Sequence, residues 1–178
     1  MNIISLFKKI FTVGVITQPV AFNETSIEKL GHSCQKIINQ YFSGSLAIRM
    51  VDAGSCNGCE LEIQALNNAF YNIECFGIHF VASPRHADLL LVTGPVSKHM
   101  EAALISTYNA MPEPKFVISV GDCGVNGGEF GVSYASLGAV SNVIPVDYAI
   151  SGCPPTPKKL LAGILSTILR HDFSKESK

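Results

Sequence analysis

The pattern of hydrophobic and polar positions changes near residue 45. Before that point apolar residues recur at helical spacing, which predicts a short amphipathic helix at residues 2–13 and a longer helix, capped by Thr25 or Ser26, that runs to about Phe42. The first helix can dock on its own domain or on a partner subunit, or it can lie flat in a membrane interface, because apolar and basic faces suit both. Residues 1–45 are therefore expected to form an N-terminal unit of helix, connector and helix.

Beyond residue 45, short apolar runs alternate with amphipathic stretches. The runs at 89–92 and 116–118 are continuously apolar, which is typical of strands buried on both faces of a parallel sheet. The pattern predicts strands at 46–51, 78–81, 89–93, 115–120 and 143–146, and helices at 59–70, 96–109 and 157–169. This alternation indicates an α/β fold, and we expect a flavodoxin-like three-layer domain with a mainly parallel sheet over residues 46–178.

Composition and charge exclude several classes of function. The chain of 178 residues is 47% hydrophobic, which suits one core of ordinary size. Thirteen basic and fourteen acidic residues give a net charge of −1, so charge does not favour a nucleic-acid partner. Lys8 and Lys9 interrupt the N-terminal apolar stretch, so we expect no export signal, and no run reaches the roughly 18 apolar residues of a membrane span. The protein is therefore expected in a reducing compartment, where clustered cysteines bind metal or do redox work.

Four of the six cysteines follow predicted strands. Cys56 and Cys59 come after the first strand as a Cys-x-x-Cys, Cys123 comes after the strand at 115–120, and Cys153 comes after the last strand. Each of these turns is rich in glycine or proline. Because the carboxyl ends of parallel strands meet at one edge of a sheet, we expect the four thiols to converge there.

Four converging thiolates suit either a [4Fe–4S] cluster or a tetrahedral zinc ion. Structural zinc sites more commonly use two Cys-x-x-Cys pairs, whereas this chain has one pair and two separate cysteines, so the pattern favours iron and sulfur. A Cys-x-x-Cys between strand and helix is also the thioredoxin arrangement, but that role leaves Cys123 and Cys153 unexplained. Cys34, on the apolar face of a predicted helix, is expected to be a core thiol, and Cys75 a buried or half-buried free thiol.

A family resemblance adds to this interpretation. Residues 51–155 resemble the small electron-transfer subunit of membrane-bound [NiFe]-hydrogenases of the formate hydrogenlyase (hydrogenase-4) type, which is similar to the 20 kDa subunit of respiratory NADH:quinone oxidoreductase. The motifs that carry the resemblance lie at 54–60, 83–88, 121–123 and 152–155. Two residues separate Cys56 from Cys59, as in hydrogenase small subunits, whereas the first two ligands of the quinone-reductase subunit are typically adjacent. The resemblance therefore favours the hydrogenase branch.

The resemblance implies that Cys56, Cys59, Cys123 and Cys153 ligate one [4Fe–4S] cluster. It implies a subunit that is not catalytic alone, in which electrons from a ferredoxin-like subunit pass to the [NiFe] site of a large partner, where protons are reduced or H₂ is oxidised. Membrane subunits complete such a complex, so the chain is expected at the cytoplasmic face of the inner membrane, held there through its partners. A related complex that reduces quinone is the alternative. A stand-alone thiol or zinc module is the less favoured hypothesis.

Charged residues beside the cysteine motifs raise further hypotheses. Glu60 follows Cys59 directly; a carboxylate at a helix N-terminus is commonly only a favourable charge, but the resemblance supports a proton relay toward the partner's metal site. Asp122 stands where the resemblance leads us to expect a small residue, and its carboxylate can either lower a cluster's reduction potential or point outward and cap a turn. Arg85 and His86 can lie near the cluster or on a surface turn.

Overall fold

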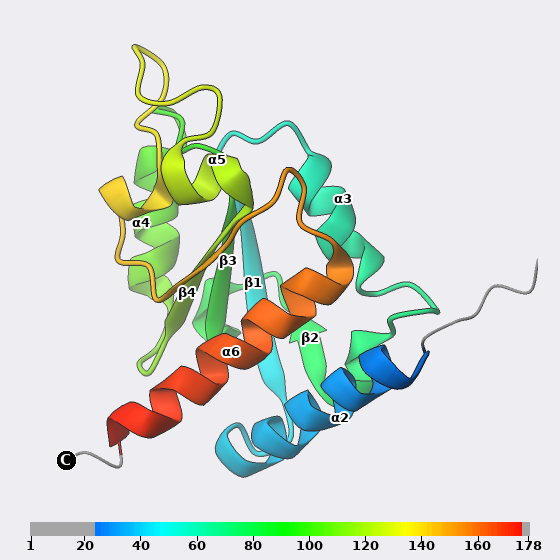
Figure 1. Cartoon of the computed structure of the whole chain (residues 1–178). Helices are drawn as coiled ribbons and strands as arrows, with labels where there is room; N and C mark the ends of the chain where they lie inside the picture. The colour runs from blue at the N-terminus through cyan, green and yellow to red at the C-terminus, as the bar shows by residue number, and fades with distance from the viewer. Residues whose placement is uncertain (1–23, 176–178) are drawn as a thin grey trace, which may run out of the picture.

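A sheet of five parallel strands forms the centre of the molecule (Figure 1). The structure is a computed structural model that describes residues 24–175, so the helix expected at residues 2–13 lies outside the described residues. The strands run in the spatial order β2-β1-β3-β4-β5, and every neighbouring pair is parallel. Their bounds are β1 (Leu46–Asp52), β2 (Ile78–Phe80), β3 (Leu89–Thr93), β4 (Phe116–Val120) and β5 (Tyr148–Ile150). This is the flavodoxin strand order, so the predicted fold class is confirmed.

Helices cover both faces of the sheet, so the fold has three layers in the order helices, sheet, helices. One face is packed against α2, α3 and α6, and the other against α4 and η3. A short helix, α5, lies at the carboxyl ends of the strands (Figure 1). The bounds are α2 (Glu24–Tyr41), α3 (Gly58–Ala65), α4 (Glu101–Ala110), α5 (Gly121–Asn126) and α6 (Pro157–Lys175), with 3-10 turns η1 (Ile73–Phe76), η2 (Pro84–His86) and η3 (Val140–Asn142). In the described part of the chain, no helix is long and apolar enough to cross a membrane.

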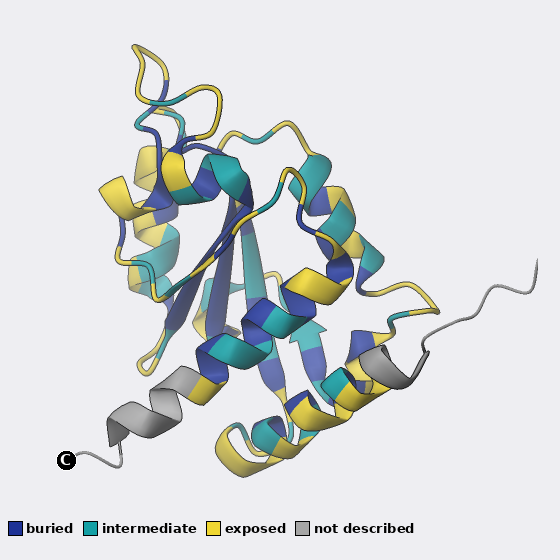
Figure 2. Ribbon diagram, viewed as in Figure 1, coloured by how far each residue is buried: buried dark blue, intermediate teal, exposed yellow. Residues whose placement is uncertain are grey.

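Strand β3 shows why the sheet needs cover on both faces. All five of its residues are buried, and the central strands stand out as buried in Figure 2. Leu91 belongs to the core under α2, α3 and α6, whereas Leu90 belongs to the core under α4, which contributes Leu104. Successive side chains of a strand point to opposite faces, so a strand covered on both sides reads as a continuous apolar run. The predicted bounds of this strand, 89–93, are confirmed.

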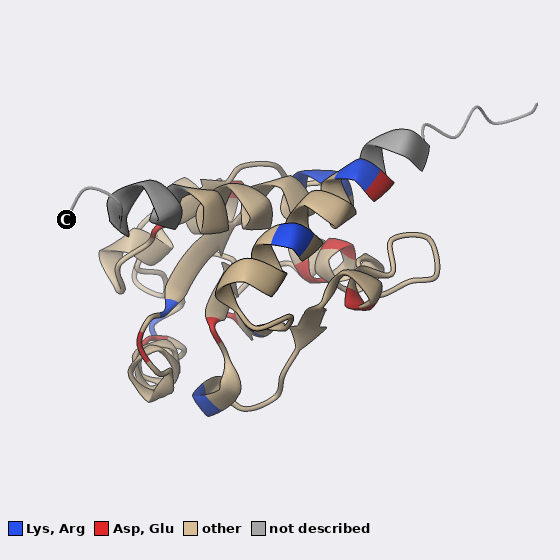
Figure 3. Ribbon diagram, turned by 90° about the horizontal axis from the view of Figure 1, so that it is seen from below, with Lys and Arg blue, Asp and Glu red and all other residues tan. Residues whose placement is uncertain are grey.

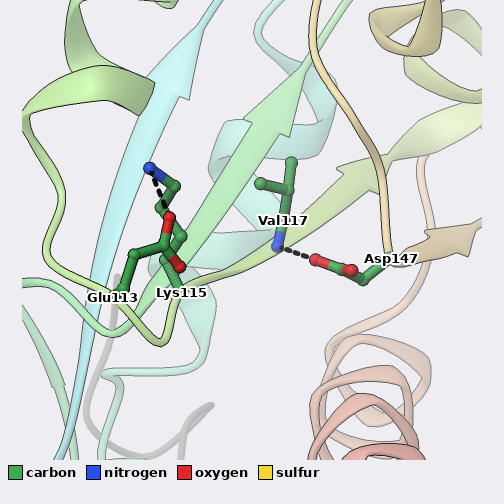
Figure 4. A network of polar contacts seen from close by, with 4 residues as sticks. All are labelled: Glu113, Lys115, Val117 and Asp147. Atoms are coloured by element: carbon green, nitrogen blue, oxygen red, sulfur yellow. Dashed lines mark hydrogen bonds and ion pairs between the residues drawn. The ribbon is translucent and has the colours of Figure 1, made fainter.

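The last strand lies later in the chain than predicted. The expected strand at 143–146 contains Pro145, which cannot donate to a ladder, and β5 begins instead at Tyr148. Asp147 starts the pairing: its Oδ2 accepts a hydrogen bond from the Val117 backbone N–H at 2.7 Å, and its own N–H donates to the Val117 carbonyl at 2.9 Å (Figure 4). The prediction of 143–146 was wrong because the pattern of apolar residues there was stronger than in the true strand.

Two helices are shorter than predicted because hydrogen bonds outside the helices compete with them. Helix α3 ends at Ala65, and Asn68 then caps a turn by accepting hydrogen bonds from the backbone N–H groups of Phe70 and Tyr71. Helix α4 starts at Glu101 because the residues before it pair with another segment: the Val96 N–H donates to the Gly138 carbonyl. Helix α5 was not predicted at all.

Lys115 precedes β4 and is held at the amino end of that strand. Its Nζ lies 3.1 Å from Oε1 of Glu113, as Figure 4 shows, and 4.1 Å from the centre of the Tyr108 ring. The ring belongs to α4, so the cation links the end of that helix to the start of the strand. This end of the sheet is therefore fixed by polar contacts, while the opposite end carries the cysteines.

Candidate metal centre

The four cysteines that follow strands meet at one small pocket on the carboxyl edge of the sheet. Cys56 and Cys59 come from the β1–α3 connection, Cys123 from α5, and Cys153 from the loop after β5. The pocket is lined by Ser55, Cys56, Gly58, Cys59, Gly94, Asp122, Cys123, Gly152, Cys153 and Pro154. The four thiols were expected to converge because each follows a strand, and in the structure they line one pocket.

The first cysteine loop is shaped by Asp52, the last residue of β1. Its Oδ1 accepts hydrogen bonds from the N–H groups of Gly54 and Ser55, both at 2.8 Å. Ser55 Oγ in turn accepts from the Asn57 N–H at 3.0 Å, and Asn57 adopts a left-handed conformation with φ of 69°. These short-range bonds turn the chain sharply, so that α3 can start at Gly58 with a cysteine on either side of the turn.

Glycines let the backbone approach the thiols closely. Gly121 has φ of +81°, and a Cβ at this position would lie 2.6 Å from Cys59 Sγ. Gly128 has φ of +54°, and a Cβ there would lie 2.7 Å from Cys123 Sγ. Real Cβ atoms do not come so near a sulfur, so both positions require glycine for their backbone angle and for the space beside the thiol.

The Cys153 loop is joined directly to the start of α5. Asp122 Oδ1 accepts a hydrogen bond from the Gly152 N–H at 2.8 Å, and the Asp122 N–H donates to the Gly152 carbonyl at 3.0 Å. Gly152 has φ of +144°, and a Cβ on it would lie 2.8 Å from the Pro155 Cα. The Asp122 carboxylate therefore bonds to the backbone of another loop.

Burial and neighbouring charges raise the pKa of two thiols in the pocket. Burial is the main cause that raises the pKa of Cys59 to about 12, and the charges of Glu60 and of the other three cysteines add to it. Burial also raises the pKa of Cys123, followed by the effects of Cys153, Cys56 and Asp122. The thiols of Cys59 and Cys123 therefore hold their protons at neutral pH. Four thiolates in this pocket would repel one another, and a bound cationic centre would offset that repulsion and displace the protons.

The donor set fits an iron–sulfur centre. Thiolates are the usual protein ligands of such clusters, and glycine at positions 121 and 128 lets the backbone lie against the sulfurs of Cys59 and Cys123. A metal centre also supplies the positive charge that would offset repulsion among four thiolates. Within residues 24–175, no three His, Cys, Asp or Glu side chains are arranged so that they hold a single metal ion.

Glu60 is the buried acidic residue of the site. It lies in the first turn of α3 beside Cys59, and only 3% of its surface is exposed. Among the residues whose side chains are described, neither of its carboxylate oxygens has a hydrogen-bond partner. A buried, unsatisfied carboxylate is costly, so Glu60 marks a position where a group from outside these residues is needed.

Arg85 and His86 are not brought to the pocket. Both are exposed on η2, which leads into the amino end of β3, whereas the cysteines follow the carboxyl ends of strands. The two remaining cysteines also lie outside the pocket. Cys34 is fully buried on α2, as predicted, and burial raises the pKa of its thiol to about 12.

Cys75 is exposed, so the prediction of a buried or half-buried thiol was wrong. It lies on the 3-10 turn η1, where residues three apart share a face. Ile73 and Phe76 point inward on that turn, which leaves Glu74 and Cys75 facing solvent. A single turn of this kind leaves no periodic pattern in the sequence.

Two residues that shape the site were not singled out from the sequence. Asp52 could have been found from the Asp-x-Gly-Ser pattern, which is typical of a turn in which an aspartate accepts from its own backbone. Gly94 has φ of +75°, and a Cβ on it would lie 2.5 Å from the Ser55 backbone nitrogen. The loop after β3 carries no cysteine, yet its glycine lets the Cys56 loop lie directly against it.

Comparisons with known proteins show which proteins the chain resembles. The family model described as NADH ubiquinone oxidoreductase, 20 kDa subunit, matches residues 56–167. Formate hydrogenlyase subunit 7 of Escherichia coli is 45% identical over 119 residues, which are 67% of this chain and 47% of that protein. A probable membrane-bound hydrogenase subunit of Pyrococcus furiosus is 44% identical over 115 residues, which are 65% of this chain and 69% of that protein. The chain thus spans about half the length of the formate hydrogenlyase subunit.

A solved structure extends the likeness to three dimensions. A chain of the membrane-bound sulfane sulfur reductase, an archaeal respiratory membrane complex, is 35% identical and superposes with a TM-score of 0.63. The superposition covers 75% of this chain and 76% of that one. The relatives are subunits of oxidoreductase complexes, and the resemblance stated from the motifs is confirmed. Since the family model matches more than half of its residues, the protein belongs to the NADH ubiquinone oxidoreductase 20 kDa subunit family.

Proposed function

We propose that the protein is the electron-transfer subunit of a membrane-associated oxidoreductase complex and that Cys56, Cys59, Cys123 and Cys153 hold one [4Fe–4S] cluster. The observation that carries the proposal is that cysteines from three separate loops line a single pocket. When bound, such a cluster supplies one-electron transfer at a potential set by its surroundings. The chain's own part is to hold four thiolates at fixed positions and to shield two of them with backbone at Gly121 and Gly128.

The acceptor in this proposal is the [NiFe] site of a large partner subunit, where protons are reduced or H₂ is oxidised. The hydrogenase branch is supported by the names of two relatives, a formate hydrogenlyase subunit and a membrane-bound hydrogenase subunit. It is also supported by the two residues between Cys56 and Cys59. The protein is then a relay that completes no reaction alone.

Exposed apolar side chains beside the pocket support a partner subunit. Gly128 lies against Cys123, and the loop that follows exposes 64% of Phe130, 76% of Val132 and 91% of Tyr134. This loop projects from the carboxyl edge of the sheet and is largely exposed (Figure 2). Charged residues make up only 15% of the chain and are scattered over the ribbon (Figure 3). Adjacent large apolar side chains on a surface mark a protein interface.

We also propose the remaining partners of the complex and its location. The proposed complex contains a ferredoxin-like subunit that donates electrons and membrane subunits that anchor the whole. The protein then lies at the cytoplasmic face of the inner membrane, held there through these partners. The relative in the solved structure belongs to a respiratory membrane complex, which supports the membrane association of the proposed complex.

Glu60 has a proposed role of its own as a proton relay between solvent and the partner's metal site. Glu60 is buried beside Cys59, and its carboxylate oxygens have no hydrogen-bond partner among the described residues. Both observations support the relay, because a group of the large subunit can then exchange a proton with this carboxylate. We expect Glu60→Gln to retain iron and the spectrum of the reduced cluster, yet to slow proton-coupled turnover about tenfold or more. Glu62→Gln, two residues along the same helix, is the matched control. Unchanged turnover in Glu60→Gln would remove the relay.

The alternative function is a quinone-reducing complex, which the name of the matching family favours. The purified complex separates the two. Nickel in the large subunit together with H₂-dependent dye reduction supports the hydrogenase, and quinone reduction without nickel supports the alternative. The relative named as a sulfane sulfur reductase makes sulfane sulfur a further acceptor to assay.

Iron analysis tests the cluster itself. We expect about four irons and four sulfides per chain, a brown colour, and a signal from the reduced cluster in electron paramagnetic resonance. Replacement of any one of the four cysteines by serine should lower the iron content, whereas Cys75→Ser should not. A colourless protein with zinc, or with two titratable redox thiols, would instead support the less favoured stand-alone module.

A further inference from the structure

We propose that Asp122 is a positioning residue that locks the Cys153 loop to Cys123, so that one side chain sets the relative positions of two cluster ligands. The inference rests on the proposed function in one respect, namely that these thiols hold a cluster. The two residues it joins, Asp122 and Gly152, directly precede the two cysteines in the sequence.

Both polar groups of the Gly152 backbone are engaged by Asp122. The Gly152 N–H donates to Asp122 Oδ1 at 2.8 Å, and the Gly152 carbonyl accepts from the Asp122 N–H at 3.0 Å. Two bonds to one residue define its distance and its orientation, which a single bond does not. Because the peptide that follows Gly152 belongs to Cys153, the direction of that thiol is set at the same time.

The Cys153 loop needs such a link because it has left the sheet. Strand β5 ends at Ile150, and Ser151, Cys153 and Pro154 are exposed. Gly152 has φ of +144°, a region open mainly to glycine. The carboxylate of Asp122 supplies a hydrogen bond to the Gly152 N–H beyond the end of β5.

The same two-bond pattern links strands elsewhere in this fold. Asp147 Oδ2 accepts from the Val117 N–H at 2.7 Å and its N–H donates to the Val117 carbonyl at 2.9 Å (Figure 4). Asp88 Oδ2 accepts from the Ala47 N–H at 2.9 Å and its N–H donates to the Ala47 carbonyl at 2.8 Å. Each of these aspartates directly precedes a strand and joins it to the neighbouring strand of the sheet. Asp122 repeats the pattern at the opposite edge, among the cysteines.

The carboxylate also brings a negative charge next to Cys123. A negative charge near a cluster disfavours the more negative reduced state and lowers its reduction potential. Asn at position 122 can keep the accepted hydrogen bond while it removes the charge, whereas Ala removes both. The two substitutions therefore separate positioning from charge.

The test compares Asp122→Ala, Asp122→Asn and the matched control Asp147→Ala in the full chain within its complex. Each alanine variant loses one accepted hydrogen bond of the same geometry, so we expect similar losses of folding stability. We expect only Asp122→Ala to release iron to a chelator faster, by about tenfold for a loss of about 1.4 kcal/mol, and to change the g values of the reduced cluster. Asp122→Asn should retain iron at the native rate and shift the reduction potential upward.

A second readout does not need the cluster. Hydrogen exchange of the Gly152 amide should accelerate about tenfold in Asp122→Ala and stay unchanged in Asp147→Ala, because only the first loses the acceptor of that amide. If exchange at Gly152 is the same in both variants, or if both release iron at one rate, Asp122 does not position the loop. A native protein without iron but with the expected exchange result would overturn the proposed function and leave the positioning role standing.

Discussion

Glycine at position 121 is required by a contact as well as by its backbone angle. We expect Gly121→Ala to lose most of its iron, because the added Cβ would meet Cys59 Sγ at 2.6 Å. Gly131→Ala is the matched control, since Gly131 also has a positive φ, of +51°, but a Cβ there meets nothing within 4 Å. Both variants should lose about 1 kcal/mol of stability from backbone strain. Equal iron contents in the two would show that the space beside Cys59 is unimportant.

The two cysteines outside the pocket should differ in reactivity. Cys75 is exposed and should be alkylated in the folded protein at pH 8, whereas the buried Cys34, with a pKa raised from 9.0 to about 12, should react only on unfolding. Peptide mapping by mass spectrometry locates the label. Labelling of both residues at the same rate would contradict the burial of Cys34.

The raised pKa of Cys34 also predicts a pH dependence of stability. The folded state disfavours its thiolate, so the contribution of this residue is fully present below pH 9 and is lost as pH rises from 9 toward 12, when the unfolded chain ionises first. Urea unfolding of the native chain should therefore show a steeper loss of stability over that range than Cys34→Ala. Parallel curves for the two proteins would contradict the assignment.

At the residue scale, the sequence predicted which cysteines are candidate ligands, but not the contacts that position them. Cys56, Cys59, Cys123 and Cys153 could be predicted to converge because each follows a strand, and parallel strands end together. The partner of Asp122 could not be predicted, because Gly152 lies 30 residues away and the contact depends on how two loops emerge from neighbouring strands.

Helix α4 offers a test at the scale of elements. Its buried residue Leu104 packs into the core on one face of the sheet, while its neighbour Ile105 is 36% exposed. We expect Leu104→Ala to lower the free energy of unfolding by about 2–5 kcal/mol, and Ile105→Ala by much less. Urea unfolding of both variants measures the difference. A similar loss in both would mean that the helix does not use this face for packing.

The bounds of an element could be predicted where its residues are completely buried, but not where hydrogen bonds to other segments set its ends. The bounds of β3 followed directly from a continuous apolar run, which only a doubly covered strand requires. Strand β5 has three residues, of which Ala149 is exposed, so it carries no such pattern. The start of α4 was missed because pairing of Val96 with Gly138 depends on a segment 42 residues later in the chain.

At the scale of the whole molecule, the apolar loop beside the pocket predicts how the complex assembles. Replacement of Phe130, Val132 and Tyr134 together by serine should leave the isolated fold intact, since all three are exposed, but should reduce recovery of the large subunit with a tagged chain about tenfold or more. Ile105→Ser, on the exposed side of α4, is the control. Full recovery of the large subunit with the triple variant would place the interface elsewhere.

The sheet order itself was predictable in outline, because strands alternating with helices give few parallel arrangements. What the pattern could not supply was the relation of the first 45 residues to the rest. In the described part, Cys34 and Ile38 of α2 pack into the same core as β1 and α6. The boundary at residue 45 stays a prediction.

The spread of the cysteines along the chain has a consequence for biogenesis. Cys56 is made early in translation, but Cys153 follows the edge strand β5, which is added to the sheet last in chain order. A ribosome-bound chain therefore has no complete pocket until nearly all of the domain has emerged. If the four cysteines hold the proposed cluster, the full set of ligands becomes available for loading only at that stage.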